Sequence, residues 1–282
     1  MNSAYVIAGL GSVSYGAGDF CGGLAARRGG AAAITFLSGF AALAVLFAGL
    51  PWTPGVIRAA DMSWAALAGA CGGLGAMLIY RALAIGPVSV ASPVLCIVGL
   101  ALPVLVGIAL GERPSALAVI GLTLAPLSIV LLAQSGAGLP AEERGRARRV
   151  LWPAISAGLA AGCFLVFFGR VESGSGLWPL ILGRTVGMTV LALGVLTWRK
   201  SLVAPRAAWG MALTAGALDS LANVAYVAAV QRGSMSLVAA LVSLAPATTV
   251  LLARVLLRER WSPPQRAGFA AALLSGALIS LG

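Results

Sequence analysis

Three charged residues are candidates for chemistry because they lie well inside long apolar stretches of the sequence: Asp19, Arg184 and Asp219. Because a charge inside an apolar segment is costly, such residues usually serve a function, such as binding a polar solute or relaying protons. At about 100° per residue, Asp219, Asn223 and Tyr226 fall on one face of a helix. This polar stripe favours a cavity, although the same groups would also suit hydrogen bonds that tie helices together.

A second stripe consists of Ser12, Tyr15 and Asp19, spaced three and four residues apart. It fits a cavity and a helix tie equally well, and Asp19 is close enough to the end of its apolar stretch to reach an interface. Arg184 suits either an ion pair with an intramembrane aspartate or the carboxylate of a solute. In the second case the solute is anionic or zwitterionic.

The composition indicates what must surround these residues. Of the 282 residues, 60% are hydrophobic and 10% are charged, and the mean hydropathy is +0.99. Soluble domains are nearer 45–50% apolar and about 25% charged, so we expect lipid to solvate most of the surface. No run alternates in polarity as a β-barrel strand would, so helices are the expected spanning element. Residues 1–25 contain Asp19 and lack Lys and Arg before the apolar run, which predicts a span rather than a signal peptide.

The net charge of +11 comes from basic residues that lie mostly between apolar stretches. This placement predicts membrane topology and contact with anionic lipids, not nucleic-acid binding. The four cysteines form no CxxC pair, the chain has no His, and no P-loop is present. We therefore expect no metal site, no cofactor and no catalytic residues of the Ser-His or Cys-His kind.

Charge, Pro and Gly divide the chain into ten spans of about 20 residues each, an all-α integral membrane fold. The first five-helix unit is residues 1–133, a basic linker loop covers 134–150, and the second unit is 151–282. Glycines four apart, such as Gly69/Gly73 and Gly183/Gly187, should let helices approach closely. The predicted spans are 3–25, 31–50, 63–85, 88–110, 115–133, 151–170, 177–198, 207–231, 234–257 and 265–281.

An internal repeat relates the two units at an offset of 147 residues. Matches among Ala, Leu and Gly arise often by chance in this composition, whereas a repeated Glu-Arg-x-Ser does not, because charged residues are scarce. Five helices per unit make the second unit enter the membrane in the opposite sense, an inverted-topology repeat typical of transporters. A duplicated structural bundle is the less favoured interpretation. The matched positions include Gly86/Gly233, Ser89/Ser236, Glu112/Glu259, Arg113/Arg260 and Ser115/Ser262.

The same offset aligns Gly99 with Pro246, each near the middle of its span, and Pro93 and Pro103 flank Gly99. These four positions are candidate hinges or kinks, although a kink can also serve packing alone. Matched interruptions point toward a binding site. We expect a cavity lined by the first, third, fourth, sixth, eighth and ninth spans. Besides the two stripes and Arg184, its candidate residues are Tyr80, Ser92, Phe164 and Ser243. Glu112 and Glu259 are expected to cap the spans that follow them.

The segment Gly233-Ser234-Met235-Ser236, Pro246, the segment Leu257–Arg260 and Gly268 resemble the signature of the EamA-type branch of the drug/metabolite transporter superfamily. Tyr15-Gly16 is similar to that family's early Trp-Gly, with Tyr in place of Trp, and Arg184 stands where members often carry an arginine. The resemblance implies ten helices and the export or exchange of small metabolites such as amino acids, as in bacterial amino-acid exporters of the inner membrane. It does not identify one substrate.

We therefore expect a secondary carrier that works by alternating access, with protons as a candidate coupling ion and with a monomer or a homodimer both open. A membrane scaffold without transport and an intramembrane enzyme are the alternatives. Loops after odd-numbered spans carry twelve basic residues and the other loops carry four, so the positive-inside rule predicts that both termini lie outside.

Overall fold

A computed structural model describes residues 3–85, 88–133, 141–172, 174–197, 201–257 and 263–281, and within these ranges the regular structure is entirely helical. α9 and α10 are two parts of one segment, interrupted at Ser243 and Leu244, so the described helices make ten segments. The α-helices are α1 (Ser3–Gly29), α2 (Ala31–Gly49), α3 (Ala59–Ile85), α4 (Val88–Ala109), α5 (Ala116–Ala133), α6 (Ala141–Phe168), α7 (Trp178–Thr197), α8 (Trp209–Val230), α9 (Met235–Val242), α10 (Ala245–Leu257) and α11 (Pro263–Leu281).

Most of these helices have the length and apolar character of membrane spans, which makes the chain a multi-pass membrane protein. Three shorter apolar stretches lie in α4, α5 and α11, at Val94–Ala109, Ala116–Leu131 and Arg266–Ile279. The six segments that are long and apolar enough to cross a bilayer are Ala31–Trp52, Ala59–Ile85, Arg149–Phe168, Trp178–Leu196, Arg206–Val230 and Met235–Leu256.

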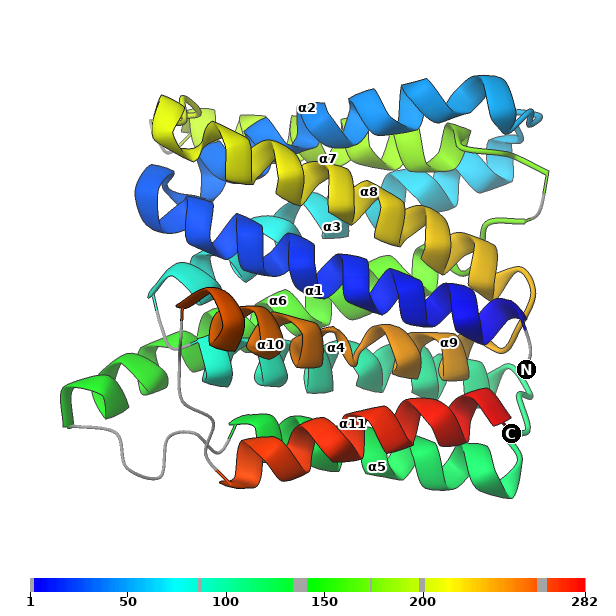
Figure 1. Ribbon diagram of the computed structural model, residues 1–282. Helices are drawn as coiled ribbons and strands as arrows, with labels where there is room; N and C mark the ends of the chain where they lie inside the picture. The colour runs from blue at the N-terminus through cyan, green and yellow to red at the C-terminus, as the bar shows by residue number, and fades with distance from the viewer. Residues whose placement is uncertain are drawn as a thin grey trace.

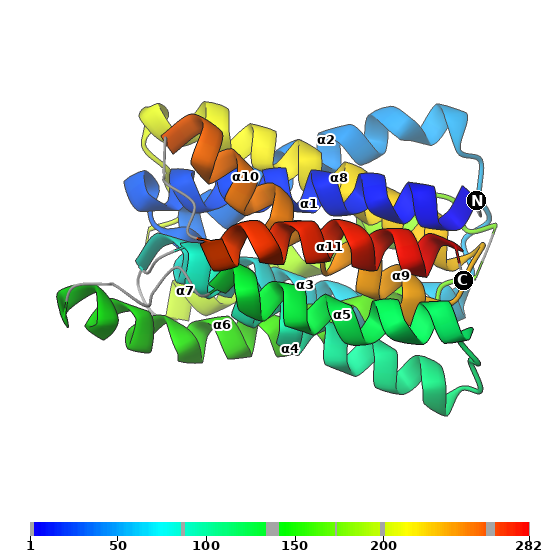
Figure 2. The ribbon, with the colours of Figure 1, turned by 60° about the horizontal axis from the view of Figure 1, so that its bottom comes forward.

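The helices lie side by side in one bundle, and each runs opposite to the segment before it along the chain (Figures 1 and 2). Both chain termini lie at the same end of the bundle, which we call the terminal end (Figure 1). The connections from α2 to α3, α4 to α5, α6 to α7 and α8 to α9 lie at that end. The alternation follows from the short connections, because a short loop can only return the chain antiparallel to the helix it leaves.

Small residues set how closely the helices pack. α3 and α7 meet where Gly69 and Gly73 face the backbone of Gly183 and Gly187, so that a Cβ on either α3 glycine would overlap the α7 main chain. This close approach confirms the expectation from the glycine spacing, since only backbone atoms fit at such a crossing. The largest helix-helix interfaces join α1 to α8, α5 to α11 and α3 to α6.

Two segments differ from the sequence-based prediction. Residues 141–150, predicted as part of a linker loop, form the first turns of α6, because Ala, Glu and Arg are strong helix formers even where the chain is polar. The span predicted at 234–257 is broken after Val242, and Pro246 becomes the second residue of the new helix, where its missing N–H costs little. The matched span α4 is helical without interruption from Val88 to Ala109.

Candidate functional site

A cavity of about 140 Å³ lies inside the bundle, between α1, α2, α3, α4, α6, α7, α8 and the break between α9 and α10. On this measure a single water needs only about 10–15 Å³, so the cavity accommodates a small solute or several waters. Most of its lining is apolar or glycine. The predicted residues that line it are Tyr15, Asp19, Tyr80, Phe164, Arg184, Asp219, Asn223 and Ser243.

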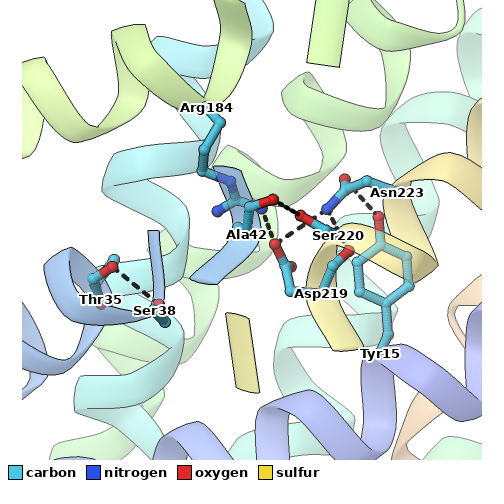
Figure 3. Close-up of polar contacts among 8 residues, drawn as sticks. All are labelled: Tyr15, Thr35, Ser38, Ala42, Arg184, Asp219, Ser220 and Asn223. Atoms are coloured by element: carbon cyan, nitrogen blue, oxygen red, sulfur yellow. Dashed lines mark hydrogen bonds and ion pairs between the residues drawn. The ribbon is translucent and has the colours of Figure 1, made fainter. Parts of the chain in front are cut away.

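An ion pair between Arg184 of α7 and Asp219 of α8 forms the centre of the polar lining (Figure 3). Asn223, one turn further along α8, donates from Nδ2 to Asp219 Oδ2 at 3.1 Å. The hydroxyl of Tyr15 on α1 donates to Asn223 Oδ1 at 2.8 Å. We call Tyr15, Arg184, Asp219 and Asn223 the central network. It joins one helix of the first half to two helices of the second.

The ion pair of the central network is largely buried but still partly exposed on the cavity. The side chains of Arg184 and Asp219 are 18% and 27% exposed. The guanidinium can bind a carboxylate through two parallel N–H···O bonds, a geometry that a solute carboxylate reproduces as well as an aspartate does. Of the two partners considered for Arg184, the intramembrane aspartate is present, and the position of the pair on the cavity leaves it open to competition from a solute.

Two residues of the polar stripes serve packing instead. Tyr226 is fully buried, and its hydroxyl donates to the carbonyl of Leu165 on α6 at 2.7 Å, so it does not line the cavity. Tyr226 shares a helix face with Asp219 but lies two turns along the axis, about 10 Å away, where its hydroxyl reaches α6. Ser12 donates to the carbonyl of Val242 at 3.4 Å and so ties α1 to the end of α9.

Of the candidate hinges, Gly99 lines the cavity and Pro103 is buried. A Cβ at Gly99 would lie 3.3 Å from the carbonyl oxygen of Gly158, so α4 and α6 pack closely there. The side chains of Ser92, Pro93 and Pro246 lie outside the described part of the structure. A hinge role for these residues stays a prediction.

The predicted set of lining spans omitted α2 and α7, although Arg184 of α7 was itself a predicted cavity residue. Thr35 of α2 and Met188 of α7 line it, and so do Gly183 and Gly187. Both helices carry few polar residues, so no stripe marks them in the sequence. Arg184 was the available signal, because an arginine that faces a cavity places its helix neighbours at i−1, i+3 and i+4 near the same cavity.

The terminal end holds a second carboxylate cluster, centred on Glu112. It was predicted to cap the helix that follows it, but instead it receives the N-terminus of α9: Met235 N–H donates to Oε1 at 2.6 Å and Ser236 N–H to Oε2 at 3.0 Å. The hydroxyls of Ser234 and Ser236 also donate to Oε2. Ser115 takes the capping role at α5, since it accepts the N–H of Ala118 at 3.2 Å.

The environment of Glu112 favours its charged form. Partial burial raises the pKa of this carboxyl, but the hydrogen bonds from Ser236, Ser234 and the two backbone N–H groups outweigh burial and lower the pKa below its usual 4.5. Since α9 begins at Met235, the negative charge also lies at the positive end of a helix dipole. Glu112 therefore joins the α4–α5 loop to α9.

A further set of polar contacts at the terminal end joins the start of α3, and Arg58 just before it, to the loop after α6. The buried carboxylate of Asp61 accepts the N–H of Glu172 at 3.0 Å and the hydroxyl of Ser175. Arg58 and Glu172 form an exposed ion pair at 2.9 Å. Within the described ranges, no group of three or more His, Cys, Asp or Glu side chains is placed to hold a metal ion.

Comparisons with known proteins agree with this architecture. Residues 149–281 match the EamA-like transporter family. One solved structure, described as "Crystal structure of protein", aligns with 99% of this chain and with 99% of its own chain, at a TM-score of 0.75 and 20% sequence identity. This likeness shows that the two chains share a fold. No curated protein matches the chain.

Proposed function

We propose that this chain is a secondary carrier for amino acids, because residues 149–281 match the EamA-like transporter family of the drug/metabolite transporter superfamily. In this proposal the carrier resides in the bacterial inner membrane and works by alternating access. Amino acids are the substrate class to which the resemblance of the sequence and the chemistry of the cavity both point.

The observation that carries the proposal is the central network on the cavity wall. An Arg–Asp pair among apolar helices costs free energy through desolvation, and residues of this kind usually serve a function. Here the pair faces a cavity large enough for a small solute. The first half contributes Tyr15 and the second half contributes Arg184 and Asp219, so any movement of one half against the other changes the site.

Alternating access finds support in the arrangement of the helices. In the order of the two halves, α1 corresponds to α6, α3 to α8 and α5 to α11. α1 packs on α8, α6 packs on α3 in the equivalent way, and α5 packs on its counterpart α11. Each helix of the second half runs opposite to its counterpart in the first (Figure 1). This is the relation that an inverted repeat requires, and rocking of two such units exposes a central site to one side and then to the other.

The amino-acid assignment rests on charge and shape. Arg184 can hold a carboxylate in place of Asp219, while the surrounding Phe164, Phe168 and Leu165 offer an apolar surface to a side chain. The chain contains no P-loop motif, so the driving force would be a solute or proton gradient. Protons are the proposed coupling ion.

Uptake of radiolabelled amino acids into proteoliposomes tests the proposal, with and without an imposed pH gradient. We expect uptake above that of empty liposomes, and a decrease in the Arg184→Ala and Asp219→Asn variants. Glu172→Gln is a suitable control, since it removes a charge from an exposed side chain away from the cavity. Gradient dependence would support proton coupling. If no amino acid enters, the amino-acid assignment is wrong, and if a wider metabolite panel also gives no flux, a scaffold role is favoured.

A further inference from the structure

Three charged side chains line the described part of the cavity, and two of them form an ion pair. Arg184 and Asp219 neutralise each other. Asp19 of α1 also lines the cavity, and within the described part of the chain it has neither a hydrogen-bond partner nor an ion-pair partner. With Asp19 ionised, the described lining therefore has a net charge of −1.

Asp19 lies on the cavity side of α1, near two tyrosines: Tyr15 of the same helix and Tyr80 of α3. Tyr15 lies one turn before it and reaches toward α8, where it donates to Asn223. Gly22 lies one turn after it, and a Cβ there would come within 2.8 Å of Tyr80 Cδ1, so the ring of Tyr80 packs directly on that turn of α1. The carboxylate of Asp19 therefore belongs to a cavity wall that also presents two aromatic rings with hydroxyl groups.

An unneutralised carboxylate in an apolar bundle is unfavourable, because the desolvation of its charge is not repaid by a partner. A cationic group beside Asp19 best neutralises this charge. A primary ammonium carries one positive charge and three N–H donors, which match a carboxylate and neighbouring hydroxyl groups, and aromatic faces also attract ammonium groups.

We propose that Asp19 binds the ammonium group of the solute. This inference rests on the proposed function and makes it more specific. A zwitterionic amino acid then uses two separate sites of the cavity, with its ammonium at Asp19 and its carboxylate at Arg184. A solute that retains the ammonium and lacks the carboxylate still binds, whereas a solute that retains only the carboxylate binds poorly.

Three solutes with the same side chain separate these contributions: leucine, leucinamide, which lacks the carboxylate, and N-acetylleucine, which lacks the ammonium. Binding is measured with purified protein in lipid nanodiscs, from the rise in unfolding temperature with solute concentration, since a ligand stabilises the state that it binds. For the unsubstituted protein we expect leucine and leucinamide to bind at least tenfold more tightly than N-acetylleucine.

The variants assign this preference to one carboxylate. Asp19→Asn should weaken binding of leucine and leucinamide by tenfold or more and leave N-acetylleucine unchanged or improved. Asp19→Glu retains the charge and should keep the preference for ammonium solutes, which shows that loss in Asp19→Asn does not come from misfolding. Glu172→Gln removes the same charge from an exposed position and should bind all three solutes as the unsubstituted protein does.

Measurements of binding and of flux distinguish a failure of the role of Asp19 from a failure of the proposed carrier function. Flux of leucine with equal binding of all three solutes would leave the carrier in place and overturn the role of Asp19. Charge-selective binding without any flux would support the role of Asp19 and overturn the proposed function. If Asp19→Asn removes only the pH dependence of leucine flux and keeps the preference for ammonium, Asp19 is a proton site and the inference is wrong. Failure of leucine and leucinamide to bind at millimolar concentration would also overturn it.

Discussion

Glu112 and Asp219 show two ways in which this chain holds a carboxylate in an apolar protein. Among the described residues, Glu112, at the terminal end, accepts hydrogen bonds only from neutral donors, which lie at the N-cap and in the first turn of α9. Asp219, in the cavity, pairs with a cation from a different helix. Neutral backbone donors are fixed and have no competitor, whereas a guanidinium on a cavity wall can exchange one carboxylate for another.

The comparison separates structural from functional charge. A carboxylate that is saturated by fixed donors stabilises one arrangement of its neighbours. A carboxylate whose partner is exchangeable takes part in binding, and a third one without a partner, Asp19, completes the site. The variants below test this distinction, in order of decreasing expected effect.

Arg184→Ala should have the largest effect on both stability and transport. It leaves Asp219 charged and unpaired, which costs about 3–5 kcal/mol for a buried pair, and partial exposure of the side chains places the value toward the lower end. Leucine uptake should fall by roughly tenfold or more, equivalent to about 1.4 kcal/mol. The double variant Arg184→Gln/Asp219→Asn removes both charges and should recover most of the unfolding temperature without recovering uptake. Recovery of uptake in the double variant would make the pair structural.

Glu112→Gln should lower the stability of the protein by about 1–2 kcal/mol, since hydrogen bonds to a charged acceptor are exchanged for weaker ones. Uptake should respond only through stability. Unfolding temperature in nanodiscs and initial uptake rate are the two measurements. A variant with unchanged stability and abolished uptake would place Glu112 among the functional residues.

The same residue predicts a pH dependence. Because the pKa of Glu112 is lower in the folded protein than its usual 4.5, the stabilisation is complete above pH 4.5 and is lost as the pH falls through the lowered folded value. Unfolding temperature should therefore decrease on acidification below pH 4.5, and the decrease should be smaller in Glu112→Gln. Identical pH profiles for the two proteins would contradict this.

Tyr15→Phe should have a smaller effect, because it deletes one hydroxyl and leaves Asn223 Oδ1 without its donor. The expected loss is about 1 kcal/mol of stability, together with a several-fold weaker affinity for leucine. Tyr226→Phe is the matched control, since that hydroxyl also makes one hydrogen bond but lies away from the cavity. Equal affinity losses in the two variants would argue that both tyrosines only tie helices.

Arg58→Ala should have the smallest effect. Its ion pair with Glu172 is exposed, with side chains 47% and 74% accessible, and such pairs contribute about 0–1 kcal/mol. The unfolding temperature should change little, and any difference should vanish in 1 M salt, where the screening length is about 3 Å. A large decrease would show that the contact between the loops before α3 and after α6 depends on this pair.

The sequence predicted the helices well because apolar length alone decides where a span lies. Residues 141–150 and the break after Val242 were not predicted, since both depend on local backbone preference within a stretch whose average character points elsewhere. Most candidate residues of the cavity were found because charge in an apolar span is conspicuous. Thr35 and Met188 were missed since nothing in their types distinguishes a cavity wall from a helix interface, and Glu112 was assigned to the wrong helix because its partner is 122–124 residues away.

Accessibility of Cys96 tests most directly whether the cavity is the route of the solute. This thiol lines the cavity, and a variant that retains only this cysteine can be labelled with a small membrane-impermeant thiol reagent from either side of proteoliposomes. We predict modification from both sides, loss of uptake in parallel with modification, and slower modification in the presence of leucine. Modification from one side only, or complete modification with uptake unchanged, would contradict a central cavity with alternating access.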